Sequence, residues 1–290
     1  MRHPDWIKVP LTGTHETKKI LRSYGLSTVC EEARCPNQGR CFSKNTATFM
    51  ILGNRCTRNC SFCAVDSLTP RPPDRDEPER VAKAAIELGL EFVVITSVTR
   101  DDLKDGGAGH FAKTIEAIRK LKKIIKIEVL TPDFKGDNQA VRVVLEAGPD
   151  VFNHNVETVP RLYGKVRPQA DYLLSLKILK KAREMFPAIK TKSGIMVGLG
   201  ETFEEVLMVM QDLRNSGCDF LTVGQYLQPR RTNIEVAEYV SPEAFEQYKE
   251  KALQMGFGAV SSSPLTRSSM NAGALFEESS AEYLHISDRV

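Results

Sequence analysis

The sequence shows no strong excess of charge of either sign and no long apolar run. Its 40 lysines and arginines nearly balance its 37 aspartates and glutamates, and they are spread along the chain with a net charge of +3. Nucleic-acid-binding proteins concentrate basic residues in a patch or stripe, so we expect no nucleic acid as a partner. No run approaches the roughly 20 apolar residues of a membrane span. The start, MRHPDWIKVPLTG, also lacks the apolar stretch of a secretory signal, so these absences predict a cytoplasmic protein without a membrane partner.

A glycine-rich dinucleotide-binding turn is also missing, and a cysteine-rich loop stands in its place. The first strand-like run is followed by NRCTRNCSFC. Six of the seven cysteines lie in two stretches, CEEARCPNQGRC (30–41) and CTRNCSFC (56–63). Structural disulfides are rare in the cytosol, so clustered cysteines there are more often metal ligands or redox groups. The seventh, Cys218, stands alone in NSGCDF and is expected to be a small buried hydrophobic residue without a function.

From about residue 45 onwards, short β-branched runs alternate with longer helical patterns. The six runs are TATFMILG, EFVVITSV, IKIEVLTP, VFNHNVET, AIKTKSGIMVG and DFLTVGQYL, at 46–53, 91–98, 125–132, 151–158, 188–198 and 219–227. Such alternation favours a parallel sheet of right-handed βαβ units. Six units, with no seventh or eighth expected, predict an α/β fold, a partial (β/α)6 TIM-type barrel open along one side. Ligands of this fold bind where the strands end, so the CTRNCSFC loop is expected at the barrel mouth.

Polar residues alternate along two of the predicted strands. In VFNHNVET, the side chains of Asn153, Asn155 and Glu157 share one face, which is expected to look into the barrel. Lys192 lies in the run AIKTKSGIMVG. Buried charged side chains need a partner or a ligand. These residues therefore either contact a ligand inside the barrel or form a Glu–Lys pair that only supports it.

The spacing CxxxCxxC of Cys56, Cys60 and Cys63 favours an iron–sulfur cluster over zinc. Structural zinc takes four protein ligands, and no fourth cysteine or histidine lies close by. Three thiolates suit a 4Fe–4S cluster with one iron left open to a small molecule. A zinc site completed by a distant residue is the alternative.

CTRNCSFC, after the first strand of a partial barrel, resembles the motif of the radical S-adenosylmethionine (SAM) enzymes, with Phe62 at the position of their aromatic residue. The resemblance implies that the open iron chelates the amino and carboxylate groups of SAM. Reductive cleavage of SAM would then give a 5′-deoxyadenosyl radical that can take hydrogen from an unactivated carbon.

The first cysteine set and a motif near the C-terminus resemble the lipoyl synthase family. Cys30, Cys35 and Cys41, spaced CxxxxCxxxxxC, match that family's auxiliary-cluster motif. PLTRSSM (264–270) resembles its RSSY motif, with Ser269 at the position of an unusual serine ligand and Met270 in place of the tyrosine. This departure puts in doubt the packing that the aromatic ring provides. Other stretches also match, and the resemblance runs from about residue 20 to 278. They are TSVTRDDLKDGGAGHF, FNHNVETVPRLYGKVRPQADYLLSL, TKSGIMVGLGET and TVGQYLQP.

The resemblance implies an enzyme, a sulfurtransferase that inserts sulfur at carbons 6 and 8 of an octanoyl chain attached to a lysine of a carrier protein. Its cofactors would be SAM and two 4Fe–4S clusters, the auxiliary one being the sulfur donor. Catalytic roles would fall to Cys56, Cys60, Cys63 and Ser269. Implied partners are the 2-oxoacid dehydrogenase acyltransferase, the glycine cleavage H protein, an electron carrier such as ferredoxin or flavodoxin, and an iron–sulfur delivery protein.

Contacts to SAM are predicted from strand alternation and from position at the mouth. The backbone near Phe62 is expected at the adenine, and Asn155 and Glu157 at the ribose or methionine groups. Lys192 is expected to bind the SAM carboxylate or to orient Glu157. The arginines 161, 167 and 267 either contact the carrier and clusters or form structural ion pairs.

These assignments divide the chain into an N-terminal extension (1–44) with the auxiliary motif, the barrel (45–230), and a C-terminal extension (231–290) with the RSS motif and a flexible tail. A monomer is expected, because a protein substrate must reach the open barrel. Another sulfur-inserting enzyme similar to biotin synthase is the closest alternative function. An iron–sulfur carrier or a zinc-stabilised binding module are alternatives of another class.

Overall fold

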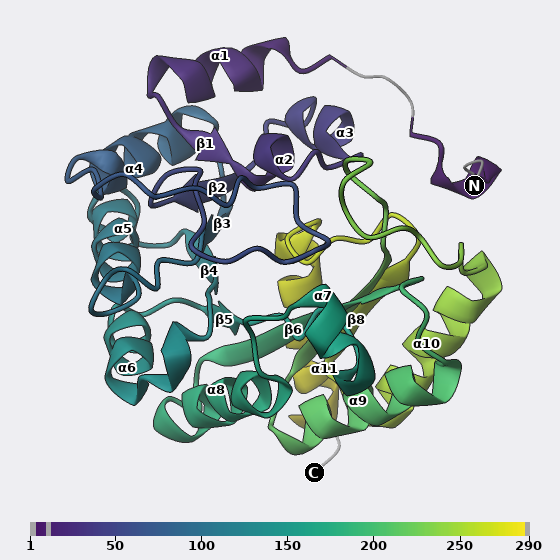
Figure 1. The fold of residues 1–290 in the computed structure, drawn as a ribbon. Helices are drawn as coiled ribbons and strands as arrows, with labels where there is room; N and C mark the ends of the chain where they lie inside the picture. Colours follow the sequence, from purple (N-terminus) through teal and green to yellow (C-terminus); the bar gives the residue numbers. More distant parts are fainter. Residues whose placement is uncertain (1–3, 10–12, 288–290) are drawn as a thin grey trace.

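The computed structural model describes residues 4–9 and 13–287, which form a curved sheet wrapped by helices (Figure 1). The eight strands lie in chain order, with β2 to β8 parallel and β1 antiparallel to β2. They are β1 (Ser27–Thr28), β2 (Thr48–Ile51), β3 (Phe92–Ser97), β4 (Lys126–Leu130), β5 (Val151–Asn153), β6 (Lys190–Val197), β7 (Phe220–Gln225) and β8 (Ala259–Ser263). This arrangement confirms the predicted α/β fold of the TIM-barrel type.

Helices follow the parallel strands and cover the outer face of the sheet (Figure 1). The helices are α1 (His15–Ser23), α2 (Val29–Glu32), α3 (Gln38–Phe42), α4 (Glu77–Glu87), α5 (Ala108–Leu121), α6 (Asn138–Glu146), α7 (Tyr163–Val166), α8 (Tyr172–Met185), α9 (Phe203–Asn215), α10 (Pro242–Gln254) and α11 (Ala272–Ser287), with short 3-10 turns at Asp5–Ile7, Phe134–Gly136 and Pro160–Leu162. Local sequence signals mark where two of these helices begin. α4 carries proline in its first turn, and α9 begins with a capping box formed by Thr202 and Glu205. Across residues 4–9 and 13–287, none of the helices has the length and apolar character needed to cross a membrane.

The strands present apolar side chains to the helices and polar ones to the interior. In β4, Ile127 and Val129 are fully buried in the hydrophobic core, whereas Glu128 between them points to the opposite face. Asn153 of β5 and Lys192 of β6 are also fully buried. The centre of the barrel is therefore polar, and its charged groups must find partners there.

The sheet contains one more parallel strand than the sequence pattern predicted. β8 pairs with β7 from Phe220↔Ala259 to Gly224↔Ser263, so the expectation of no seventh unit is wrong. Its sequence, AVSSS, lacks the run of β-branched residues that marks the other strands. This strand belongs to the segment 231–290, which was expected to be only an extension.

Helix α11 packs against the amino ends of the strands. Phe276 lies 5.9 Å from the ring of Phe92, the first residue of β3, and 6.5 Å from that of Phe220, the first residue of β7. Leu275 joins the same cluster with Val151 of β5. The structure differs from the expected flexible tail, because helix α11 continues to Ser287. Residues 288–290 lie outside the described part. The amino end of the barrel is thus covered, and the opposite end carries the cysteine-rich loop.

Candidate active site

The cysteines of CTRNCSFC lie in a loop at the carboxyl ends of the parallel strands, directly after β2. The loop contains no helix, and contacts with distant residues hold it in place. The Cys56 N–H donates to the carbonyl oxygen of Asp66 at 2.9 Å, and the Asn233 side chain donates to the carbonyl oxygen of Cys63 at 2.8 Å. The loop therefore lies at the barrel mouth, as its position in the sequence predicts.

Burial raises the pKa of two thiols of this loop, those of Cys60 and Cys63, the latter to about 12. Cys56 raises both further, so the three thiols lie close together. The guanidinium groups of Arg167 and Arg58 act in the opposite direction on the pKa of Cys60. Metal ligands must be deprotonated, so nearby positive charge favours the thiolate form that iron binds.

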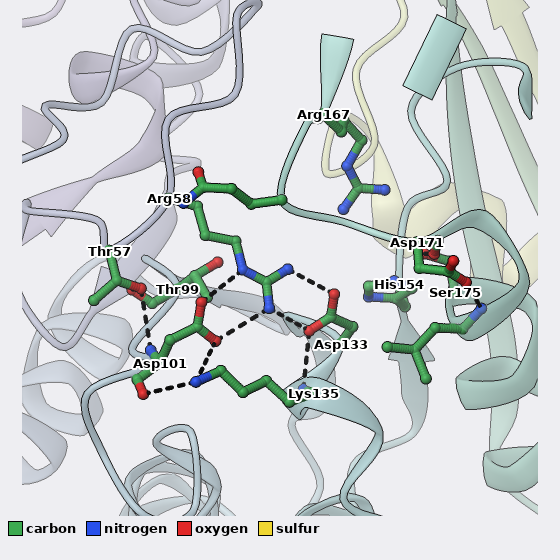
Figure 2. A network of polar contacts seen from close by, with 12 residues as sticks. Thr57, Arg58, Thr99, Asp101, Asp133, Lys135, His154, Arg167, Asp171 and Ser175 are labelled. Atoms are coloured by element: carbon green, nitrogen blue, oxygen red, sulfur yellow. Dashed lines mark hydrogen bonds and ion pairs between the residues drawn. The ribbon is translucent and has the colours of Figure 1, made fainter. Parts of the chain in front are cut away.

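Arg58 fastens this loop to two other loops of the barrel mouth (Figure 2). Its guanidinium donates to both carboxylate oxygens of Asp133, at 2.6 and 2.7 Å, and to both of Asp101, at 2.7 and 3.1 Å. Burial works against the charge of Arg58, but these hydrogen bonds outweigh it and raise its pKa above the usual value. Lys135 adds a bond to the carbonyl oxygen of Asp101 at 3.1 Å. The two aspartates thus fix Arg58, which lies between Cys56 and Cys60 in the sequence.

The cysteines of CEEARCPNQGRC lie on two short helices and the turn between them. Cys30 belongs to α2 and Cys41 to α3, and the Cys35 N–H donates to the carbonyl oxygen of Cys30 at 3.1 Å. Burial raises the pKa of Cys30 to about 12 and also raises that of Cys41, and Cys35 raises both further. The structure therefore brings these three thiols together as a second set.

The C-terminal RSS motif reaches this second set from the other end of the chain. A cavity of about 400 Å³, the auxiliary cavity, is lined by Cys30, Cys35, Cys41 and Ser269. Arg267 also lines it. The donor set of three thiols and one hydroxyl thus surrounds a single space.

One buried side chain joins the two ends of the chain beside this cavity. Asn37, between the second and third cysteines of the set, donates to the carbonyl oxygen of Leu265 at 2.6 Å. The same amide nitrogen lies 3.1 Å from the sulfur of Met270. Met270, which departs from the tyrosine of the resembled motif, therefore contacts the first cysteine stretch.

Two further cavities lie between the auxiliary cavity and the cysteine loop. The cluster-loop cavity, of about 230 Å³, is lined by Cys56, Cys60, Cys63, Phe62, Asn155, Glu157 and Arg167 among others. The central cavity, of about 390 Å³, is lined by Cys30, Cys35, Asn155, Glu157, Ser268 and Ser269 among others. Neighbouring cavities share lining residues, so the three form a row from one cysteine set to the other.

The donor sets fit two iron–sulfur clusters. In the described part of the chain, no three Cys, His, Asp or Glu side chains converge as they would around one metal ion. A cubane does not need such convergence, because each thiolate binds a different iron atom. Three thiolates in one set would leave an iron open, and the other set would supply a hydroxyl as a fourth donor.

The predicted SAM-contact residues divide into two groups. Phe62, Asn155 and Glu157 line the cluster-loop cavity, and burial raises the pKa of Glu157 while Arg167 opposes this rise.

Lys192, the fourth residue predicted to contact SAM, lies elsewhere. It forms a fully buried ion pair with Glu128, with Nζ–Oε distances of 2.9 and 3.0 Å. The Glu–Lys pair expected from the sequence therefore involves Glu128, and the idea that Lys192 orients Glu157 is wrong. A charge buried this deeply requires a counter-charge within reach, and the inward position of β4 supplies it.

The three arginines also have different surroundings. Arg161 is exposed and pairs with Glu205 of α9 at 2.7 Å, which matches the structural alternative. Arg167 is buried and donates to the carbonyl oxygens of Asn155 and Val156, at 3.0 and 3.2 Å. Arg267 lines the central and auxiliary cavities.

Four residues of this region were not identified from the sequence: Arg58, Asn37, Glu128 and Ser268. A signal existed for three of them. Arg58 and Asn37 lie inside the two cysteine motifs, and Glu128 alternates with apolar residues in KIEVL. Ser268 differs, because no spacing rule separates it from its neighbour Ser269.

The fold and the open three-cysteine loop define a class of protein, the radical SAM enzymes. The Radical SAM superfamily profile matches residues 50–213. The fold is also similar to those of solved structures. A maturase of the [FeFe]-hydrogenase, HydG, has a TM-score of 0.59 at 15% identity, covering 88% of this chain and 57% of that chain. Methylornithine synthase (PylB) has a TM-score of 0.56 at 16% identity, covering 87% and 75%.

Similarity to curated proteins narrows this class. Lipoyl synthase of Caldanaerobacter subterraneus subsp. tengcongensis is 58% identical over 274 residues, 94% of this chain and 96% of its own length. That of Alkaliphilus metalliredigens is 55% identical over 280 residues, covering 96% and 97%. The chain belongs to the lipoyl synthase family. It is a radical SAM sulfurtransferase that inserts two sulfur atoms into a protein-bound octanoyl chain, uses SAM and 4Fe–4S clusters, and acts on lipoyl carrier proteins.

Proposed function

We propose that the two cysteine sets divide the lipoyl synthase reaction between them, and that the central cavity is where its two halves meet. The observation that carries this proposal is the row of three cavities with a cysteine set at each end. This row of cavities corresponds to a proposed division of the chain into residues 1–44, 45–230 and 231–290. The first part supplies the auxiliary cysteines, the second six of the seven parallel strands, and the third the strand β8 and the serine.

Cys56, Cys60 and Cys63 would hold the cluster that binds SAM. When bound, this cluster and SAM together supply the radical that removes hydrogen from carbons without activating groups. The chain's own contribution is positioning. Arg58 fixes the loop through Asp101 and Asp133, which keeps the ligand set in place before any cofactor binds.

Phe62, Asn155 and Glu157 would contact SAM in the cluster-loop cavity. The Asn155 amide donates to a Glu157 carboxylate oxygen at 3.1 Å, which orients that carboxylate. Arg167 lines the same cavity and fixes the backbone of Asn155 and Val156. Polar groups held in this way suit the amino, carboxylate and ribose groups of SAM.

Cys30, Cys35, Cys41 and Ser269 would hold the auxiliary cluster, the sulfur donor of the family. These residues come from opposite ends of the chain and meet in the auxiliary cavity. Cys30, Cys35 and Ser269 also line the central cavity, so bound sulfur would border the space that receives the substrate.

The central cavity suits the octanoyl chain. Its volume of about 390 Å³ falls within the range of about 300–1,000 Å³ usual for small-molecule sites. Much of its lining is apolar, and includes Val29, Leu130, Ile195, Met196 and Leu227. An apolar chain would gain by leaving water there, with its carbons held between the two cysteine sets.

The carrier proteins that we propose are the 2-oxoacid dehydrogenase acyltransferase and the glycine cleavage H protein. Further partners would be an electron carrier such as ferredoxin or flavodoxin and an iron–sulfur delivery protein that rebuilds the auxiliary cluster. We place the reaction in the cytoplasm and expect a monomer. The exclusion of nucleic acid as a partner stays a prediction.

Anaerobic turnover tests the proposal. Protein reconstituted with both clusters is incubated with SAM, a strong reductant and an octanoyl-lysine peptide, and the products are read by mass spectrometry. The expected result is a monothiolated peptide followed by a lipoyl peptide, together with deoxyadenosine. Deoxyadenosine without sulfur in the peptide would contradict the substrate. No deoxyadenosine from protein with both clusters loaded would contradict the function as a whole.

A further inference from the structure

The two adjacent serines of the RSS motif make different contacts. Ser269 lines both the auxiliary and the central cavity. Ser268 lines the central cavity, and its hydroxyl is used by two asparagine side chains. It accepts a hydrogen bond from Nδ2 of Asn153 at 2.8 Å and donates one to Oδ1 of Asn155 at 2.9 Å. Ser268 is therefore hydrogen-bonded to side chains of the barrel. Its neighbour Ser269 is the residue that lines a cavity with the auxiliary cysteines.

From Asn155 the contacts continue toward the cysteine loop. Asn155 donates from Nδ2 to Glu157 at 3.1 Å, and both residues line the cluster-loop cavity. The amide of Asn155 is therefore oriented at both ends, because its oxygen accepts from Ser268 and its nitrogen donates to Glu157.

From Asn153 the contacts continue into the barrel core. Its Nδ2 also donates to Oε1 of Glu128 at 2.8 Å, and Glu128 pairs with Lys192. Asn153, Glu128 and Lys192 are each at most 1% exposed. This end of the network is an anchor, because a buried ion pair cannot rearrange without leaving a charge unpaired.

Two glycines allow the close approach that the network needs. A Cβ at Gly194 of β6 would lie 2.9 Å from Oδ1 of Asn155, within the space of the amide. A Cβ at Gly224 of β7 would collide with the carbonyl oxygen of Thr266, in the loop that carries the RSS motif. The backbone of β6 and β7 is thus shaped to receive Asn155 and this loop.

We propose that Ser268 is a positioning residue that joins the serine end of the auxiliary site to the SAM side of the barrel. Its hydrogen bonds hold the backbone of Ser269 at a fixed place relative to Asn155 and Glu157. This inference rests on the proposed function, since it takes Ser269 as a cluster ligand and Asn155 and Glu157 as SAM contacts. It assigns to the first serine of the motif a role distinct from ligation.

Fixed spacing matters because both reaction partners must reach the same carbon. A misplacement of about 1 Å can cost on the order of 100-fold in rate when reacting groups are held by separate elements. The serine end of the auxiliary site and the Asn155 side of the SAM site are distant in the chain, with Ser268 and Asn155 separated by 113 positions. The side-chain contact of Ser268 with Asn155 joins these distant segments directly.

The test uses full-length protein loaded with both clusters and two measurements that do not depend on turnover. The first is the Kd for SAM without reductant, and the second is the rate at which a chelator removes iron from the auxiliary site. Ser268→Ala is expected to weaken SAM binding roughly three- to tenfold, the effect of losing about one hydrogen bond. It is also expected to accelerate iron loss, and Ser268→Thr, which keeps the hydroxyl, is expected to restore both values.

The matched control is Ser262→Ala. Ser262 is a buried serine of β8 whose hydroxyl donates to the carbonyl oxygen of Phe245 at 2.7 Å, outside the network. It reports the effect of losing one buried serine hydroxyl without touching either site. The proposal is overturned if Ser268→Ala matches this control, if only one of the two measurements changes, or if Ser268→Thr fails to restore them.

A double-mutant cycle provides a second test of the proposal. Because Ser268 acts on SAM through Asn155, the effects of Ser268→Ala and Asn155→Ala on the Kd should be smaller together than their sum. Simple additivity would overturn the proposal. Failure of the proposed function is distinguishable, because it would appear in the unaltered protein as a missing second cluster or as no binding of SAM.

Discussion

The two cysteine sets differ in the way the protein holds them. The set in CTRNCSFC occupies a loop of the barrel itself, and a buried arginine with two aspartate partners fixes it. The set in CEEARCPNQGRC lies outside the parallel strands on short helices, and its serine comes from the other end of the chain. Asn37 is the side chain that links these two ends through Leu265. We interpret this difference through the fate of each proposed cluster. Firmly anchored ligands suit a cluster that stays in the protein. Ligands from both ends of the chain suit a cluster that is consumed and rebuilt.

The largest effects should come from removing one cysteine of each set. Cys56→Ala is expected to abolish cleavage of SAM, and Cys30→Ala to keep that cleavage but abolish sulfur insertion. Deoxyadenosine and thiolated peptide are measured separately by mass spectrometry. Cys218→Ala is the control, because Cys218 is fully buried and its thiol contacts the carbonyl oxygens of Thr191 and Phe220, which belong to neither set. Loss of SAM cleavage in Cys30→Ala protein that still holds the other cluster would contradict the division of roles.

Removal of the arginine anchor should come next. Arg58→Met leaves Asp133 buried without its partner, which typically costs about 3–5 kcal/mol of unfolding free energy. Denaturant unfolding of the cluster-free protein measures this loss, and iron analysis should show poorer loading of the CTRNCSFC loop. Arg161→Met, which removes the exposed pair with Glu205, is the control and should lose much less. Equal stability of the two variants would show that Arg58 is not an anchor.

Replacing Ser269, the serine that we propose as a ligand, should have a smaller effect, confined to the auxiliary site. We infer that a serine oxygen is a more readily replaced ligand for iron than a thiolate, and that a cluster which is consumed benefits from one such weak attachment. Ser269→Cys is therefore expected to retain auxiliary iron but to slow sulfur transfer several-fold, with SAM cleavage unchanged. Rates of thiolated peptide and deoxyadenosine formation check this. Full sulfur transfer with an intact auxiliary cluster would refute the idea.

Asn37→Ala should loosen the auxiliary set without affecting the other. It removes a buried hydrogen bond to the carbonyl oxygen of Leu265, which costs on the order of 1 kcal/mol or slightly more. Iron loss to a chelator should become faster for the auxiliary cluster alone. Gln254→Ala removes an exposed amide contact with Glu250 on α10, outside both sets, and serves as the control. Faster loss from both clusters would mean that Asn37 acts on the whole fold.

The smallest effect should come from Met270→Tyr, which restores the residue of the resembled motif. Met270 borders the auxiliary cavity of about 400 Å³, so a ring can be accommodated there. The change in unfolding free energy is expected to stay below about 1 kcal/mol, as for most tolerated substitutions. Thermal unfolding and iron content measure it. Loss of auxiliary iron would show that methionine is required in this chain.

Much of the site could be predicted from local spacing. Three cysteines at CxxxCxxC, three at CxxxxCxxxxxC and the RSS motif predict the ligand residues that we propose, because ligands of one cluster must lie near one another. Alternation along VFNHNVET also predicted the shared face of Asn153 and Asn155, whose side chains both reach Ser268. The alternating strands and helices predicted six of the seven parallel strands, and they missed β8 because AVSSS lacks an apolar pattern.

Other features were decided by the path of the chain in space. The partner of Lys192 is Glu128, 64 positions away, and Arg58 reaches Asp133 across 75 positions. Ser268 and Ser269 are adjacent residues of the same type. Ser268 contacts the asparagines of the barrel, whereas Ser269 borders the auxiliary cysteines. Sequence by itself determined which residues could bind iron, because that depends on the chemistry of their side chains and local spacing. Only the tertiary structure decided which buried polar groups pair, because each must find its partner among residues that folding brings close.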